Sequence, residues 1–172
     1  SADGTSSVWA KEPCEDASNE WTRKRMLRHH SDKEKEATPK SAITSTLIHF
    51  SGTEKDQKHL HIVTSDASGR FKVWEGDSGH LEKLAKIHDV NWSGCGGIVK
   101  TALMRKHKST ATTSNDEKVY VVTSHFDSNS DISRALCWDA FSQNDDQKTP
   151  IRGYVHEYPK KGVPFYGRLS SF

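Results

Sequence analysis

Four short runs of apolar, β-branched and aromatic residues are typical of strands. Three of them lie early, at 42–50 (AITSTLIHF), 59–65 (HLHIVTS) and 69–74 (GRFKVW), and the fourth is VYVVTSHF at 119–126. SGTEKDQK separates the first two and predicts a hairpin loop around Gly52. We therefore expect an antiparallel hairpin, a third short strand, and a fourth strand further along the chain.

Other stretches space their apolar residues by three or four and favour helices. In HLEKLAKIH, for example, Leu81, Leu84 and His88 fall on one helical face. The predicted helices cover 19–30, with Asn19 as N-cap, and 80–88, 98–107 and 131–141, while 151–158 fits a short helix or a strand. Strands and helices do not alternate strictly, so the expected fold class is α+β, with a central antiparallel sheet and helices packed on it.

The length of 172 residues suits one domain with a flexible N-terminal tail. We assign 1–18, which are rich in Ser, Asp and Glu, to the tail and 19–172 to the domain. Only 33% of residues are hydrophobic and 28% are charged, which predicts a small core. No apolar run reaches the roughly 18 residues of a membrane span, and the N-terminus lacks a basic-then-apolar leader. We expect a soluble protein without a membrane partner.

The cysteines Cys14, Cys95 and Cys137 are widely spaced and form no Cys-x-x-Cys pair. This pattern predicts neither a disulfide framework nor a structural zinc, and it fits a reducing intracellular compartment.

The formal net charge of +2 is small, but basic residues gather in three segments, at 21–30, 103–108 and 158–168. Two of these segments also carry aromatic residues. Basic side chains interleaved with aromatic ones suit a phosphate backbone with exposed bases, whereas a solvated protein surface explains most charge runs. The residues that we predict to contact DNA are Arg23, Lys24, Arg25, Arg105, Lys106, Lys108 and Lys160.

Two further motifs carry candidate chemistry. His59 and His61 lie two apart on a predicted strand, so both imidazoles point to one face and can bind one metal ion. Tyr158 and Lys161 form a Tyr-x-x-Lys motif. A phenol becomes a useful nucleophile when a cation lowers its pKa or when a metal polarises the phosphate that it attacks.

The strand with His-hydrophobic-His, preceded by a hairpin and followed far downstream by Tyr-x-x-Lys, resembles the HUH endonucleases, especially the origin-nicking domains of parvovirus-type replication initiators. The resemblance implies that His59 and His61 hold Mg²⁺ or Mn²⁺, that Tyr158 attacks a phosphate of single-stranded DNA to leave a 5′-phosphotyrosyl link, and that Lys161 supports the developing charge. It implies a third metal ligand near the His pair, for which His49 is the first choice and Glu54 the second.

The same resemblance implies single-stranded or hairpin origin DNA as the partner, the host cell nucleus as the location, and an attached helicase domain and homo-oligomer in the full-length protein. Tyr154 is an alternative nucleophile, because Pro159 disfavours helical geometry at Tyr158. Tyr154 has the better helical context but no lysine three residues on.

A second resemblance uses some of the same residues. HLHIVTSDASGRFKVWEGDSG resembles a strand-turn-strand section of a WD-repeat propeller blade, and SRALCWD at 133–139 is a fainter copy. This alternative implies a non-enzymatic protein-interaction module. The interval between the VTS triplets at 63–65 and 122–124 exceeds the roughly 40–45 residues of a blade, and a predicted helix at 80–88 occupies the place of a strand. Both features favour the nuclease.

Overall fold

In the computed structural model, residues 1–11, 20–29, 41–51, 59–106, 118–130, 132–141 and 149–157 are described. Within these ranges the chain forms strands and two short 3-10 helices. They are β1 (Thr5–Lys11), β2 (Trp21–Arg28), β3 (Ile43–Ser51), β4 (His59–Asp66), β5 (Arg70–Asp77), η2 (Leu81–Lys83), β6 (Ala85–Asn91), η3 (Ser93–Cys95), β7 (Gly97–Lys106), β8 (Lys118–Asp127), β9 (Ile132–Trp138) and β10 (Arg152–Glu157).

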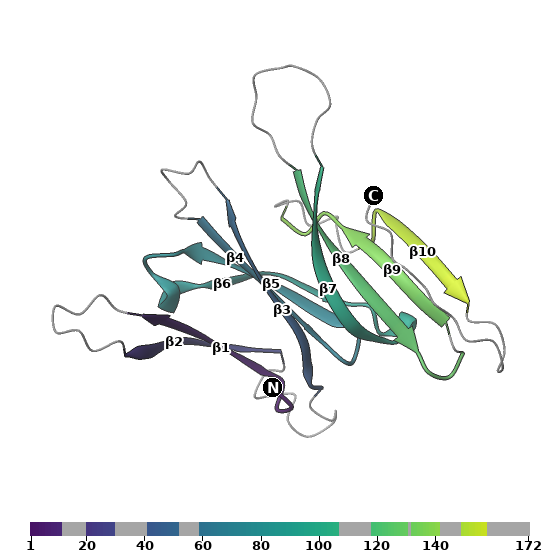
Figure 1. The fold of residues 1–172 in the computed structure, drawn as a ribbon, viewed down its shortest axis with the longest axis horizontal. Helices are drawn as coiled ribbons and strands as arrows, with labels where there is room; N and C mark the ends of the chain where they lie inside the picture. The colour runs from purple at the N-terminus through teal and green to yellow at the C-terminus, as the bar shows by residue number, and fades with distance from the viewer. Residues whose placement is uncertain are drawn as a thin grey trace, which may run out of the picture.

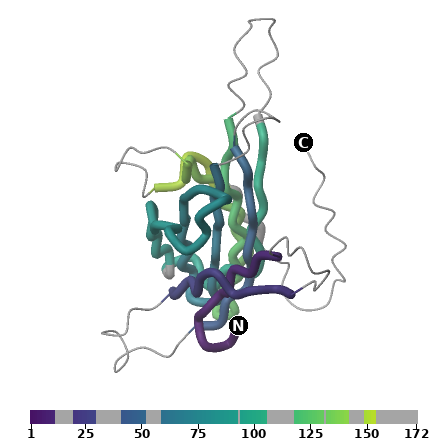
Figure 2. Tube along the Cα trace, turned by 90° about the vertical axis from the view of Figure 1, so that its left-hand side faces the viewer, coloured from purple at the N-terminus to yellow at the C-terminus, as the bar shows by residue number. Residues whose placement is uncertain are grey.

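The strands form three antiparallel sheets that follow one another along the chain. β1 pairs with β2, the first four-stranded sheet has the order β3-β4-β5-β6, and the second has the order β10-β9-β8-β7. Every pairing joins strands that are consecutive in sequence, so both four-stranded sheets are simple meanders. Figure 1 shows the three sheets as successive layers, and in Figure 2 the β1–β2 pair crosses in front of the first four-stranded sheet.

The expected α+β class is wrong, because the described part of the chain is nearly all strand. The segments at 19–30, 98–107 and 131–141, predicted as helices, contain β2, β7 and β9. The segment at 80–88 keeps only the short turn η2 before its residues enter β6. Helix propensity is a weak preference of well under 1 kcal/mol per residue, and pairing with a neighbouring strand overrides it here.

The four stretches predicted as strands are confirmed. Residues 42–50, 59–65, 69–74 and 119–126 correspond to β3, β4, β5 and β8. The segment at 151–158, left open between helix and strand, contains β10. Thr5–Lys11, placed in the flexible tail, instead forms β1 and pairs with β2. In the described part of the chain, no helix is long and apolar enough to cross a bilayer.

Two hydrophobic clusters hold the layers together, one on each face of the first four-stranded sheet. Between the two four-stranded sheets, Val63, Phe71 and Val73 pack against Ile98, Val121, Leu136 and Trp138. On the opposite face, Leu60, Ile62 and Trp74 pack against Leu27 of β2. Burying such side chains contributes about 1.5–3 kcal/mol each, so the stacking of sheets stabilises strands that would be marginal alone.

A buried hydrogen-bond chain ties the first four-stranded sheet to the segment after β2. The indole Nε1 of Trp74 donates to Thr64 Oγ1 at 3.0 Å, and Thr64 Oγ1 lies 2.6 Å from His29 Nε2. His29 Nδ1 lies 2.9 Å from Asp66 Oδ2. The ionised carboxylate of Asp66 can only accept, so His29 Nδ1 carries the proton given to it. Burial lowers the pKa of His29 and favours the neutral ring, whose Nε2 then accepts a hydrogen bond from the Thr64 hydroxyl.

The second four-stranded sheet repeats the first two links of this chain. Trp138 Nε1 donates to Thr123 Oγ1 at 2.8 Å, and Thr123 Oγ1 lies 2.8 Å from His125 Nε2. His125 Nδ1 then reaches the carbonyl oxygen of Gly96 at 3.2 Å. In this chain the imidazole, His125, lies on strand β8, and the last acceptor, Gly96, lies just before β7. In the first chain the imidazole, His29, lies outside the four-stranded sheet, and the last acceptor, Asp66, ends strand β4.

Thr64 and Thr123 are the central residues of the two VTS triplets, and both lie on the second strand of a four-stranded sheet. Trp74 and Trp138 both lie on the third strand, opposite Ile62 and Val121. The triplets therefore mark equivalent positions of a structural repeat.

Candidate metal centre

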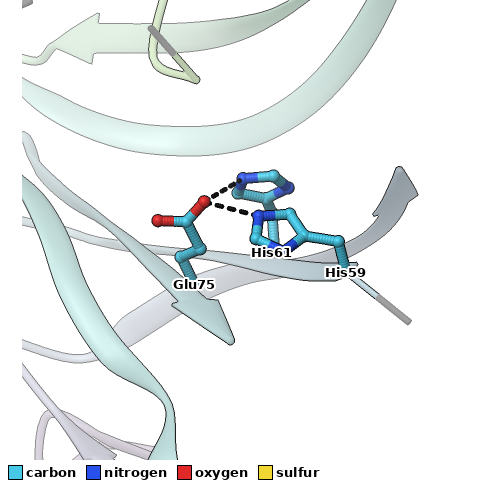
Figure 3. Close-up of side chains that lie close together, drawn as sticks. All are labelled: His59, His61 and Glu75. Atoms are coloured by element: carbon cyan, nitrogen blue, oxygen red, sulfur yellow. Dashed lines mark hydrogen bonds and ion pairs between the residues drawn. The ribbon is translucent and has the colours of Figure 1, made fainter. Parts of the chain in front are cut away.

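His59, His61 and Glu75 meet on one face of the first four-stranded sheet, as Figure 3 shows. His59 and His61 are two apart on β4, which puts both side chains on the same face. Glu75 lies opposite His61 in the register of β4 and β5. The Nε2 atom of His59 is 2.5 Å from Glu75 Oε1, the Nε2 atom of His61 is 3.4 Å from the same oxygen, and one ligand atom from each residue lies within 4.8 Å of the others.

The cluster has an exposed side and a buried side. The side chain of His59 is 52% exposed and that of Glu75 is 22% exposed, whereas that of His61 is only 7% exposed. The His61 ring packs edge-on against Phe141, with 4.8 Å between centroids, and stacks with His49 at 6.0 Å. Within the described structure, His61 Nδ1 is buried without a hydrogen-bond partner.

Burial lowers the pKa of His61, and the nearby imidazoles of His59 and His49 lower it further, while the carboxylate of Glu75 acts in the opposite direction. The net shift favours the neutral ring at pH 7. A neutral imidazole keeps a nitrogen lone pair, which is the form that binds a metal.

The sequence placed His59 and His61 on one face, and the structure confirms this placement. It also brings His49 to the cluster, because His49 lies opposite His61 on β3. Glu54 lies outside the described residues. Glu75 was missed, although counting outward from the turn between Asp66 and Arg70 would have paired it with His61.

The proposed nucleophile and its lysine, Tyr158 and Lys161, lie outside the described residues, as does Lys160. Tyr154 belongs to β10, which pairs with β9 in the second four-stranded sheet, whereas the His pair lies in the first. Tyr154 is therefore on a strand, and the helical context that favoured it is absent.

The basic residues predicted to contact DNA fall on two different sheets. Strand β2 contains Arg23, Lys24 and Arg25. Arg25 pairs with Val8 and Arg23 with Trp9, so the pairing register of β1 and β2 shifts at Lys24. The guanidinium of Arg25 donates to the backbone carbonyl of Glu82. Arg105 and Lys106 end β7, and Arg105 is exposed. Lys108 lies outside the described residues.

No family model, curated protein or solved structure matches this chain. Inferences about its function therefore depend on the fold and on the residues themselves.

Proposed function

We propose that this chain is a scaffold built from blade-like sheets, similar to WD-repeat propeller blades, and that it acts as a non-enzymatic interaction module. The observation that carries this proposal is the repeat of a buried Trp–Thr hydrogen bond at equivalent positions of two successive four-stranded meanders, with each threonine also in contact with a buried imidazole. A propeller blade is such a four-stranded antiparallel sheet, and propellers stack blades side by side.

Both features that counted against the blade interpretation have a structural explanation. The segment at 80–88 lacks the predicted helix and leads into β6, the fourth strand of the first sheet. The long interval between Thr64 and Thr123 includes the connection at 107–117 between β7 and β8, which lengthens the second unit. Connections between strands tolerate such insertions at small free-energy cost.

The direction of stacking supports the same proposal. Each four-stranded sheet turns its Thr–Trp face toward the sheet before it: Trp74 packs with Leu27, and Trp138 packs with Phe71. The first sheet turns its other face, with Val63 and Val73, toward the sheet that follows it.

The equivalent face of the second sheet is marked by Val122 and its cross-strand partners Ala102 and Cys137. Among the described residues on this face, Cys137 on β9 is buried, whereas Ala102 and Met104 on β7 are exposed, so the open part of the face lies over β7. We infer that this face receives a further sheet with an outward Thr–Trp face, supplied by another polypeptide segment. A second copy of the described sheets does not fit, because both of their Thr–Trp faces are already covered.

The nicking reaction is the competing hypothesis, and it makes a product that a scaffold does not make. The test is to incubate the protein with single-stranded and hairpin oligonucleotides and Mn²⁺, and to search for a covalent adduct on a denaturing gel. We expect no adduct and little DNA binding even at low salt. An adduct that disappears with Tyr158→Phe or Tyr154→Phe would overturn the non-enzymatic conclusion and identify the nucleophile.

A further inference from the structure

We propose that His59, His61 and Glu75 bind one divalent transition-metal ion of the Zn²⁺ type, with water in the remaining position. This site is independent of the interaction role, since its residues lie apart from both Trp–Thr–His chains. The ligands come from two paired strands, so the bound ion would link β4 to β5 beside the start of β4.

The distances need little adjustment to accept an ion. Tetrahedral bonds of 2.0–2.1 Å place neighbouring ligand atoms about 3.3 Å apart. His61 Nε2 and Glu75 Oε1 are already 3.4 Å apart, and His59 Nε2 has to move outward from its 2.5 Å contact with the same oxygen. The ligand nitrogens of His59 and His61 also lie within 4.8 Å of each other. The exposed side chain of His59 has room to turn toward an ion.

The chemistry of the donors selects the ion. Two imidazole nitrogens and one carboxylate suit Zn²⁺, Co²⁺ or Ni²⁺, whereas Mg²⁺ prefers an octahedral shell of oxygens. This changes the metal expected from the nuclease resemblance, which was Mg²⁺ or Mn²⁺. Three protein ligands leave one position open, and the exposed side of the cluster lets water reach it.

A simple surface ion pair explains part of the cluster but not all of it. The contact between His59 and Glu75 is of the ordinary surface kind. His61 differs, because its side chain is only 7% exposed and its Nε2 is turned toward Glu75 Oε1 at 3.4 Å, longer than a good hydrogen bond, which leaves room for an ion between the two atoms. The aromatic ring of Phe141 and the second imidazole of His49 close the buried side around it.

The experiment is a titration of the purified protein with Co²⁺, whose tetrahedral complexes absorb visible light, followed by competition with Zn²⁺ and with Mg²⁺. We expect one equivalent of Co²⁺ to bind, micromolar Zn²⁺ to displace it, and millimolar Mg²⁺ to leave it in place. His59→Ala and Glu75→Gln should each weaken the affinity for Co²⁺ and Zn²⁺ by about tenfold or more.

His80→Ala is the matched control, because His80 also lies beside a glutamate, Glu82 at 3.5 Å, but no third candidate ligand joins them among the described residues. Its metal affinity should equal that of the unchanged protein. His59 and Glu75 are used rather than the buried His61 so that the fold survives, which circular dichroism and a urea unfolding curve verify. The site is refuted if no Co²⁺ binds, if both variants bind as tightly as the control, or if Mg²⁺ displaces Co²⁺.

Discussion

At the scale of single residues, two threonines stand out because each joins three side chains, its own, an indole and an imidazole, through one hydroxyl group. Thr64 and Thr123 are fully buried, and each hydroxyl accepts a hydrogen bond from an indole and donates one to an imidazole. A hydroxyl group is the smallest side-chain group that can do both. This explains why threonine, which also has a β-branched carbon suited to strands, occupies both positions.

Replacing Thr64 with valine keeps the shape but removes both hydrogen bonds. Trp74 Nε1 and His29 Nε2 are then left without partners in the core, and we expect the free energy of unfolding to fall by about 2–3 kcal/mol. Thr123→Val should have a similar effect on the second sheet. Urea unfolding followed by tryptophan fluorescence measures both.

Thr64→Ser is the rescue variant, because it retains the hydroxyl and loses only a methyl group. Thr22→Val, on an exposed position of β2, is the control and should change stability by less than about 0.5 kcal/mol. Equal stabilities of Thr64→Val and Thr22→Val would contradict the role assigned to the hydroxyl.

The buried imidazoles make stability depend on pH. Burial lowers the pKa of His29, partly opposed by Asp66, and burial also lowers the pKa of His125. In the unfolded chain both rings return to the ordinary value of 6.5. Below that pH the unfolded chain binds more protons than the folded protein, so stability falls as the pH falls. We expect the urea midpoint to drop progressively from pH 7.5 to pH 5.5.

His125→Gln should reduce this slope, since it removes one of the buried rings whose pKa is lowered and leaves an amide that can still hydrogen-bond. Thr22→Val, which changes an exposed residue of β2 that has no ionisable side chain, serves as the comparison and should leave the slope unchanged. A urea midpoint that is constant over this pH range would show that neither buried ring opposes protonation.

At the scale of elements, the sequence predicted the strands that are short runs of apolar and β-branched residues, and it failed where good helix formers are mixed in. β8 is such a run, VYVVTSHF, and in the structure it alternates buried and partly exposed side chains along most of its length. β9 is less clear, because Leu136, Cys137 and Trp138 are all buried and the apolar residues run together. In such a run, the good helix formers of DISRALCWDAF favour a helix, and only the pairing with β8 selects a strand.

In the candidate metal centre, too, the sequence identified some residues and missed one that depends on strand pairing. His59 and His61 were identifiable because their spacing matches the strand period. Glu75 required the register of β4 and β5, which depends on the turn that joins them. In that turn, Asp66 Oδ1 accepts hydrogen bonds from the backbone amides of Ser68 and Arg70, at 2.9 and 3.2 Å. Once the turn is fixed, the opposite position of every residue on the two strands follows.

At the scale of the whole molecule, the sheets form a directional stack, with each Thr–Trp face turned toward the preceding sheet. The first four-stranded sheet is covered on both faces, although its strand β3 still exposes Ile48 and Phe50, at 58% and 48%. Exposed apolar side chains on a sheet mark surfaces that other segments cover. By the same reasoning, we expect a further sheet to cover the outward face of the second four-stranded sheet.

Two neighbouring residues of β7 test whether that face is open in this chain. Met104 is 43% exposed on the outward face, opposite Tyr120, while Leu103 packs against the core between the sheets, opposite Val121. Met104→Glu should therefore change the free energy of unfolding by less than about 0.5 kcal/mol, and Leu103→Glu should lower it by about 2 kcal/mol or more, because a carboxylate would enter the core. The binding of a hydrophobic fluorescent dye should fall in Met104→Glu if the open face is where the dye binds. Equal destabilisation by the two substitutions would mean that the outward face is already covered, and the inference that it receives a further sheet would then fail.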